Sequence, residues 1–130
     1  MDAESKRKLL GKTIASLEQS VVVVEGKRDQ LALQKAGIQC LSVAVAGRKL
    51  EETIKKIGAL ALGKRVVLLT DFDEEGKRKE KELREALLHQ GVKADIATRR
   101  NFRHLFRLST VEQLPFALER LEKEVAGNSN

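Results

Sequence analysis

Two aspartates that follow a short apolar run are the residues best suited to chemistry in this chain. Residues 66–76 read VVLLTDFDEEG, so Asp71 and Asp73 stand two positions apart just after four apolar residues and Thr70. In extended backbone, residues two apart point the same way, so both carboxylates can face one site while Phe72 turns away. Two carboxylates this close repel each other, and a bound divalent cation usually offsets that repulsion. Oxygen ligands suit Mg²⁺ or Mn²⁺.

A second stretch of the chain has the same design. Residues 21–24 are four valines, and Glu25 and Gly26 follow them. Each stretch therefore places an acidic residue where a buried strand would end, at the edge where open α/β folds bind ligands. If the two strands are neighbours, Glu25 joins Asp71 and Asp73 in a three-carboxylate metal site. The alternative is that the aspartates only cap a helix or shape a turn.

The remaining sequence supplies the elements that would position this site. Strands are predicted at residues 21–24, 40–45, 66–69 and 92–97, and helices at residues 2–18, 28–36, 50–57, 76–90 and 114–125. The alternation of strands and helices predicts a three-layer α/β/α fold with a four-stranded parallel sheet, flanked by N- and C-terminal helices. For Glu25 to meet the aspartates, the first and third strands must be adjacent, so the predicted strand order is 2-1-3-4.

Length and composition are consistent with one domain over residues 1–130, with a core at about 20–98. In that division an N-terminal helix occupies residues 1–19, and a basic segment and a C-terminal helix occupy residues 99–130. No apolar run approaches the roughly 18 residues of a membrane span, and no secretory signal opens the chain. Cys40 is the single cysteine, so a cytoplasmic location is expected, without a disulfide or a cysteine zinc cluster.

The charge of the chain favours an anionic partner. The net charge is +6 and the isoelectric point is near 9.6, and nucleic acid is the commonest partner of such a surface. The basic residues of one segment, RRNFRHLFRL at residues 99–108, alternate with aromatic ones. They could grip phosphates and stack on bases, or the apolar members could dock the segment while the arginines stay in water. The four basic candidates there are Arg99, Arg100, Arg103 and Arg107.

The two acidic motifs carry a resemblance to a known family. VVVVEGKRD followed by LLTDFDEEG resembles the two signature motifs of the Toprim domain, over about residues 20–98. Toprim is the metal-binding catalytic domain of topoisomerases, bacterial-type primases, the maturase of 5S ribosomal RNA and OLD-family nucleases. The family pattern is Glu-Gly after the first strand, here Glu25 and Gly26, and Asp-x-Asp-x-x-Gly after the third, here Asp71, Asp73 and Gly76.

The details of the first motif are most similar to one branch of that family. The EGK-x-D form, with Lys27 and Asp29, resembles the RNA-maturase branch and the small stand-alone Toprim proteins of archaea and bacteria.

The resemblance implies roles for these residues. Asp71 and Asp73 would hold Mg²⁺ (or Mn²⁺), and Glu25 would share the metal or act as a general acid or base in phosphoryl transfer. Glu74 and Glu75 could add an outer ligand, or they could lie in a first helical turn, stabilised by the helix dipole. The nucleic-acid-binding candidates at the rim are Lys27, Arg28 and Lys77, in addition to the four arginines above.

Several reactions of the family are excluded for this chain alone. It has no tyrosine, which a topoisomerase needs as its nucleophile, and 130 residues leave no room for the further domains of a primase. Hydrolysis of a phosphodiester remains, so the first hypothesis is a Mg²⁺-dependent nuclease acting on structured RNA or DNA, with RNA favoured, in RNA processing or repair. The second is a non-catalytic nucleic-acid or ribonucleoprotein binding adaptor. The third is a metal-binding or oligomerising domain that needs a protein partner or a second copy.

Overall fold

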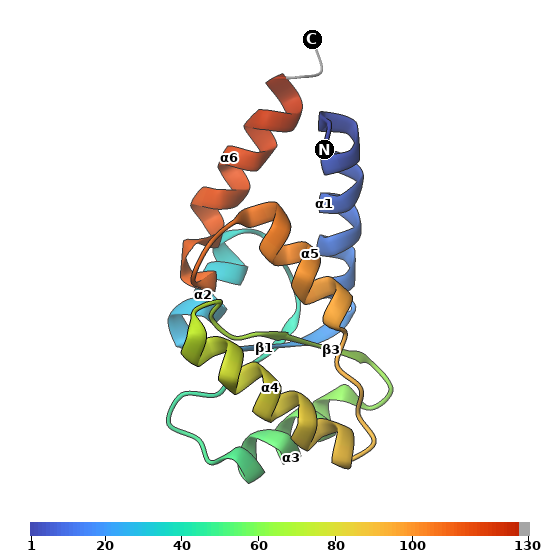
Figure 1. Ribbon diagram of the computed structural model, residues 1–130, viewed down its shortest axis with the longest axis vertical. Helices are drawn as coiled ribbons and strands as arrows, with labels where there is room; N and C mark the ends of the chain where they lie inside the picture. The colour runs from blue at the N-terminus through green and yellow to red at the C-terminus, as the bar shows by residue number, and fades with distance from the viewer. Residues whose placement is uncertain (128–130) are drawn as a thin grey trace.

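A computed structural model describes residues 1–127 of the chain (Figure 1). The elements in chain order are α1 (Ala3–Glu18), β1 (Ser20–Val24), α2 (Lys27–Lys35), β2 (Leu41–Ala44), α3 (Leu50–Ala61), β3 (Arg65–Leu69), α4 (Glu74–His89), α5 (Ile96–Phe106), the 3₁₀ turn η1 (Val111–Gln113) and α6 (Leu114–Gly127). The helices predicted at residues 2–18, 28–36 and 76–90 are confirmed as α1, α2 and α4, with ends that shift by one or two residues.

The sheet has three parallel strands in the order β2-β1-β3. The predicted adjacency of the first and third strands is therefore confirmed. Val24, the last residue of β1, pairs with Leu69, the last residue of β3, so the two strands end at the same level. All five residues of β1 are buried, as expected for the central strand of a covered parallel sheet.

The prediction of a fourth strand at residues 92–97 is wrong. Only Ala94 of this segment forms a bridge, to Val66 of β3. The next residue, Asp95, caps α5: its Oδ1 accepts a hydrogen bond from the Thr98 amide at 3.0 Å and its Oδ2 accepts one from the Thr98 hydroxyl at 2.6 Å. This cap starts the helix at Ile96, so the polar cap ends the extended backbone before a strand can form.

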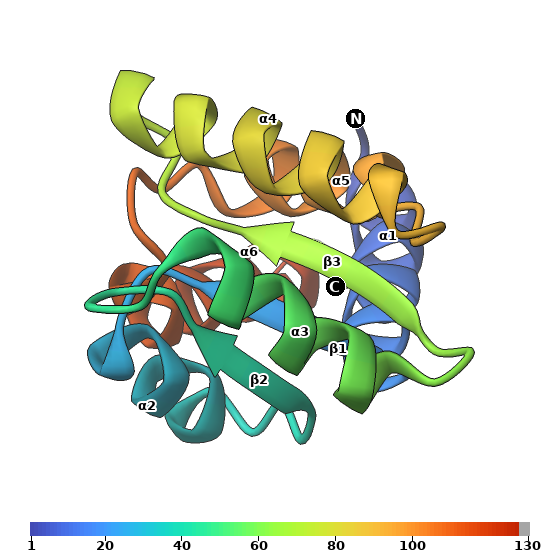
Figure 2. The same cartoon turned by 90° about the horizontal axis from the view of Figure 1, so that it is seen from below.

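Helices cover both faces of the sheet (Figure 2). On one face Val21, Val23 and Leu68 pack in a cluster with residues of α3 and α4. On the other face Val22 and Leu69 pack in a larger cluster with residues of α1, α2, α5 and α6. The predicted three-layer architecture is thus present, around a sheet of three strands instead of four. Across residues 1–127, no helix combines the length and the apolar character that crossing a membrane would require.

Candidate metal and nucleic-acid site

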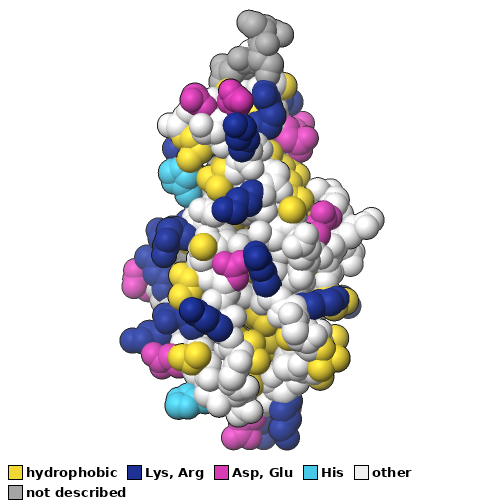
Figure 3. Space-filling view, turned by 90° about the vertical axis from the view of Figure 1, so that its right-hand side faces the viewer, with side chains coloured by type: hydrophobic (Ala, Val, Ile, Leu, Met, Phe, Trp, Pro, Cys, Tyr) yellow, Lys and Arg dark blue, Asp and Glu magenta, His cyan; other side chains and the backbone are white. Residues whose placement is uncertain are grey.

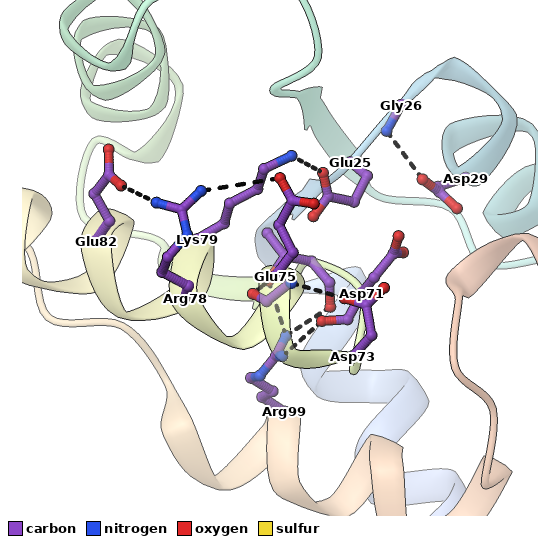
Figure 4. A network of polar contacts seen from close by, with 12 residues as sticks. Glu25, Gly26, Asp29, Asp71, Asp73, Glu75, Arg78, Lys79, Glu82 and Arg99 are labelled. Atoms are coloured by element: carbon purple, nitrogen blue, oxygen red, sulfur yellow. Dashed lines mark hydrogen bonds and ion pairs between the residues drawn. The ribbon is translucent and has the colours of Figure 1, made fainter.

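Three acidic residues, Glu25, Asp71 and Asp73, lie at the carboxyl edge of the sheet (Figure 4). Glu25 follows β1 directly, and Asp71 follows β3 after Thr70. Because the two strands end at the same level, their next residues leave the sheet together. Asp73 comes from the short loop that leads into α4. The fold therefore brings the three predicted acidic residues to one edge, as the sequence analysis expected.

Asp71 is the most perturbed carboxylate at this edge. Its Oδ1 atom is buried and has no hydrogen-bond partner among the described residues. Burial raises the pKa of Asp71 to about 6, with further contributions from the negative charges of Glu25, Asp29 and Asp73. A carboxylate oxygen that is buried without a donor is costly, so this atom is suited to receive a cation or a proton.

Glu25 has a cationic partner that the sequence analysis did not identify. The ammonium of Lys79, on the second turn of α4, donates a hydrogen bond to Glu25 Oε2 at 2.9 Å. The Glu25 side chain is only 16% exposed, and this hydrogen bond raises the pKa of Lys79. The basic residues of α4 include Lys77, Arg78 and Lys81 as well as Lys79, so residue type alone does not single out Lys79.

Asp73 caps the helix that follows the site. Its Oδ1 accepts a hydrogen bond from the Gly76 amide at 2.8 Å, which satisfies one of the free amides of the first turn of α4. The capping alternative considered from the sequence is therefore correct for this oxygen of Asp73. Glu74 and Glu75 lie in the same first turn, where they pair with Lys77 and Arg78 at 3.6 and 3.9 Å.

Gly76 is required by close packing of backbone. A Cβ atom at this position would lie 1.9 Å from the Asp71 carbonyl oxygen. The Gly76 carbonyl in turn accepts a hydrogen bond from the buried Thr70 hydroxyl at 2.8 Å. The glycine of the motif therefore lets the start of α4 lie directly against the residue that carries the perturbed carboxylate.

Arg99 has a different place from the one that the sequence suggested. Its Nη1 atom donates to the carbonyl oxygens of Leu68 and Thr70, both at 2.9 Å, and its Nη2 atom donates to the Asp71 carbonyl at 3.3 Å. The guanidinium lies 4.4 Å from the centre of the Phe72 ring. Arg99 is thus bound to the strand-end loop, which it holds in place, and its binding of nucleic acid stays a prediction.

The remaining basic candidates do not all gather at this edge. Lys77, Arg100 and Arg103 line one hollow between α4 and α5. Arg107 lines another, beside α1 and α6. Arg28 pairs with Glu112 at 3.7 Å and lies with α2 and η1.

Near the start of α2, Asp29 holds the glycine of the first motif. Its Oδ2 accepts a hydrogen bond from the Gly26 amide at 2.9 Å, and burial raises the pKa of Asp29. Lys27 is the first residue of α2, and it is exposed.

The carboxylates have the chemistry of a magnesium site. All the candidate ligands are oxygen atoms, and Asp71 Oδ1 is buried without a partner. In the arrangement described for residues 1–127, however, no three acidic, histidine or cysteine side chains are close enough to hold one ion together. Glu25 Oε2 is bound to Lys79, and Asp73 Oδ1 is bound to the Gly76 amide. The oxygen atoms are of the type that Mg²⁺ prefers, but the carboxylates would have to move closer together, and Glu25 would have to leave Lys79, before three of them could hold one ion.

Comparison with known proteins is consistent with this geometry. A UPF0292 protein of Methanocaldococcus jannaschii is 33% identical over 86 residues, which is 63% of this chain and 63% of that protein. A UPF0292 protein of Pyrococcus furiosus is 35% identical over 86 residues, 65% of this chain and 62% of that protein. The match thus spans less than two thirds of the length of these curated relatives.

The fold has a solved counterpart as well. A protein from Aquifex aeolicus superposes with a TM-score of 0.64 and 29% sequence identity, over 80% of this chain and 96% of that one. The sequence pattern that defines the Toprim domain matches residues 19–98, which include both acidic motifs and all three strands. This chain therefore belongs to the Toprim family.

Proposed function

We propose that this protein is a Mg²⁺-dependent nuclease that cleaves structured RNA or DNA, with RNA favoured. Membership of the Toprim family associates the chain with metal-dependent chemistry on nucleic acids. The observation that carries the finer proposal is Asp71, whose buried Oδ1 has no donor and lies among the charges of three other carboxylates. An all-oxygen site of this kind at a sheet edge is suited to phosphodiester hydrolysis, which needs only activated water as its nucleophile.

Each residue of the acidic edge has its own role in the proposed reaction. Asp71, Asp73 and Glu25 would hold Mg²⁺, which when bound neutralises charge on the phosphate and lowers the pKa of water. Glu25 is the candidate general acid or base, and one of its oxygens accepts a hydrogen bond from Lys79. Lys79 offers a second cation toward the phosphate once Glu25 turns away. A cytoplasmic location belongs to the same proposal.

A cleavage assay tests the proposal. The protein is incubated with end-labelled RNA hairpin, single-stranded RNA and duplex DNA, each in Mg²⁺, Mn²⁺ or EDTA. We expect metal-dependent cleavage that Asp71→Asn/Asp73→Asn reduces by more than the roughly 100-fold that loss of an outer-shell metal partner costs. Asparagine caps helices as well as aspartate does, so α4 should persist in this variant.

The matched control changes two aspartates that cap other helices. Asp2 caps α1 and Asp95 caps α5 at the opposite edge of the sheet, so Asp2→Asn/Asp95→Asn removes equal charge away from the site. Cleavage that survives in the site variant, or that is lost equally in the control, would contradict the nuclease proposal.

One observation favours a second function, the non-catalytic nucleic-acid or ribonucleoprotein adaptor. Glu25 and Asp73 already bind protein groups, so the acidic edge is neutralised in part without a metal. In the same assay, an adaptor would bind the labelled RNA in a salt-sensitive way and leave it intact in every metal. A protein partner or a second copy of the chain would then supply any further activity.

A further inference from the structure

A strongly basic hollow lies between α4 and α5, beside the acidic edge. It has a volume of about 380 Å³, and its charged lining residues are Lys77, Glu80, Arg84, Arg99, Arg100 and Arg103. Five cationic side chains therefore surround one carboxylate. Each helix contributes one face, because Lys77, Glu80 and Arg84 follow the three- and four-residue spacing of an α-helix, and Arg103 follows Arg100 by three residues and Arg99 by four.

The charges of this hollow are only partly neutralised. Glu80 is taken by Arg84, whose Nε lies 2.6 Å from Glu80 Oε1. Lys77 has a weak partner, Glu74, at 3.6 Å, and the Glu74 side chain is 96% exposed. Among the contacts of residues 1–127, Arg100 and Arg103 have no carboxylate within ion-pair distance. The hollow therefore keeps a positive potential that an anion can use.

The space-filling view shows where basic side chains lie on one face of the molecule. In Figure 3 dark blue Lys and Arg side chains are spread over this face, and several of them lie along the left edge, which corresponds to the front of Figure 1, where α4 and α5 lie. No acidic residue occurs in α5, which runs from Ile96 to Phe106. The helix thus presents cations without the interleaved carboxylates that α4 carries.

The hollow and the acidic edge share one loop. Phe72, which stands between Asp71 and Asp73 in the chain, forms part of the wall of the hollow. Its ring is only 7% exposed, since Arg99 covers one side and Phe102 stacks at 6.0 Å. A base therefore finds no free aromatic surface here, whereas a phosphate finds guanidinium groups, whose planar donors match its oxygens.

We propose that the hollow between α4 and α5 binds the phosphate backbone of the nucleic acid on which the neighbouring acidic edge acts. The inference rests on the proposed function for the nature of the ligand. Recognition of phosphate without base contacts predicts binding that is independent of sequence and strongly dependent on salt. The proposal assigns Arg84 to the nucleic-acid-binding surface, beside Lys77, Arg100 and Arg103. Arg107 is not part of this surface.

Binding measured in EDTA tests this surface without cleavage. The double variant Arg100→Gln/Arg103→Gln removes two exposed cations of the hollow. Its control, Lys55→Gln/Lys56→Gln, removes two exposed cations of α3 that do not line it. Fluorescence anisotropy with a labelled DNA duplex and a labelled RNA hairpin is recorded over a range of KCl concentrations. Since each lost phosphate contact reduces the salt slope by about 0.9 on duplex DNA, we expect the hollow variant to reduce it by about 2.

The possible results separate this inference from the proposed function. A reduced salt slope in the hollow variant, with a wild-type salt slope in the α3 control, supports phosphate binding in the hollow, whether or not the protein cleaves nucleic acid. Wild-type affinity and slope in the hollow variant would overturn it, and so would an equal loss in the α3 control. In either of those cases, cleavage that depends on Asp71 and Asp73 would still stand as a separate result.

Discussion

At the scale of single residues, Asp71 is the clearest sign of chemistry in this protein. Its buried oxygen has no donor among the described residues, and the negative charges of Glu25, Asp29 and Asp73 act on it. The positive charge of Lys79 opposes them only in part, because burial and the three negative charges still raise the pKa of Asp71 to about 6. Without a bound cation, the protein therefore keeps an unfavourable charge at this position near neutral pH.

This charge predicts a pH-dependent effect of Asp71→Asn on stability in EDTA. The pKa of Asp71 is about 6 when folded and near 3.8 when unfolded, so the folded state binds the extra proton between these values. The stability contributed by this group therefore falls as pH rises from about 4 to about 6. Asparagine carries no charge, so the variant should gain stability relative to wild type across that window, by on the order of 1 kcal/mol after allowance for solvent screening.

Urea denaturation at several pH values checks this prediction. The difference in unfolding free energy between the variant and wild type should increase from pH 4 to pH 6 and stay level from pH 8 to pH 9, where Asp71 is fully charged. A difference that is the same at pH 5 and pH 8 would show that Asp71 has an ordinary pKa.

At the scale of elements, α5 holds the loop that carries the site. Most of this helix lies outside residues 19–98, which the family pattern matches. Its Arg99 donates to the backbone carbonyls of Leu68, Thr70 and Asp71. The carbonyl of Ser109, just after the helix, accepts a hydrogen bond from the Phe72 amide at 2.9 Å. The aspartates are therefore fixed from the side of α5 as well as by the cap of α4.

Arg99→Lys tests this role with little change in charge. A lysine ammonium cannot reproduce the fork that reaches the carbonyls of Leu68, Thr70 and Asp71, so we expect a loss of about 1–3 kcal/mol in unfolding free energy. Hydrogen exchange at the Phe72 and Gly76 amides should become faster in the same variant. Arg100→Lys, at the exposed neighbouring position, is the matched control and should stay within about 0.5 kcal/mol of wild type. Equal effects of the two substitutions would contradict the role of Arg99 in holding the loop.

At the scale of the whole molecule, the terminal helices complete the core of the domain. The larger apolar cluster joins Val22 and Leu69 of the sheet to Leu17 of α1, Phe102 of α5 and Leu118 of α6. All of α6 and most of α5 lie beyond the segment that the family pattern matches. One face of the sheet thus depends on residues beyond the two motifs.

Two phenylalanines provide a matched comparison of this packing. Phe102 is fully buried, with its ring 4.8 Å from that of Phe106, whereas Phe116 is 82% exposed. Phe102→Ala should lower the unfolding free energy by about 3–5 kcal/mol through the cavity that it leaves. Phe116→Ala should change it by no more than about 0.5 kcal/mol. Similar unfolding free energies for both variants in urea would show that α5 is not part of the cooperative core.

The sequence by itself was sufficient for the parallel sheet, the adjacency of its first and third strands and the placement of Glu25, Asp71 and Asp73 at one edge of the sheet. Four-residue apolar runs leave little choice of structure, and parallel neighbours must bring the ends of their strands to one edge. The apolar residues of 92–97 also predicted a fourth strand there, and this prediction failed because Asp95 caps a helix instead.

Only the tertiary structure decided what the side chains of the site contact. Glu25 and Lys79 are far apart in the chain, as are Arg99 and the carbonyls that it binds, and no local pattern predicts such pairs. The basic segment was open to two interpretations for the same reason. Burial of Phe102 and Phe106 turns Arg99 toward the loop and leaves Arg100 and Arg103 facing α4 across the hollow, because one helix cannot present all its residues to the same surroundings.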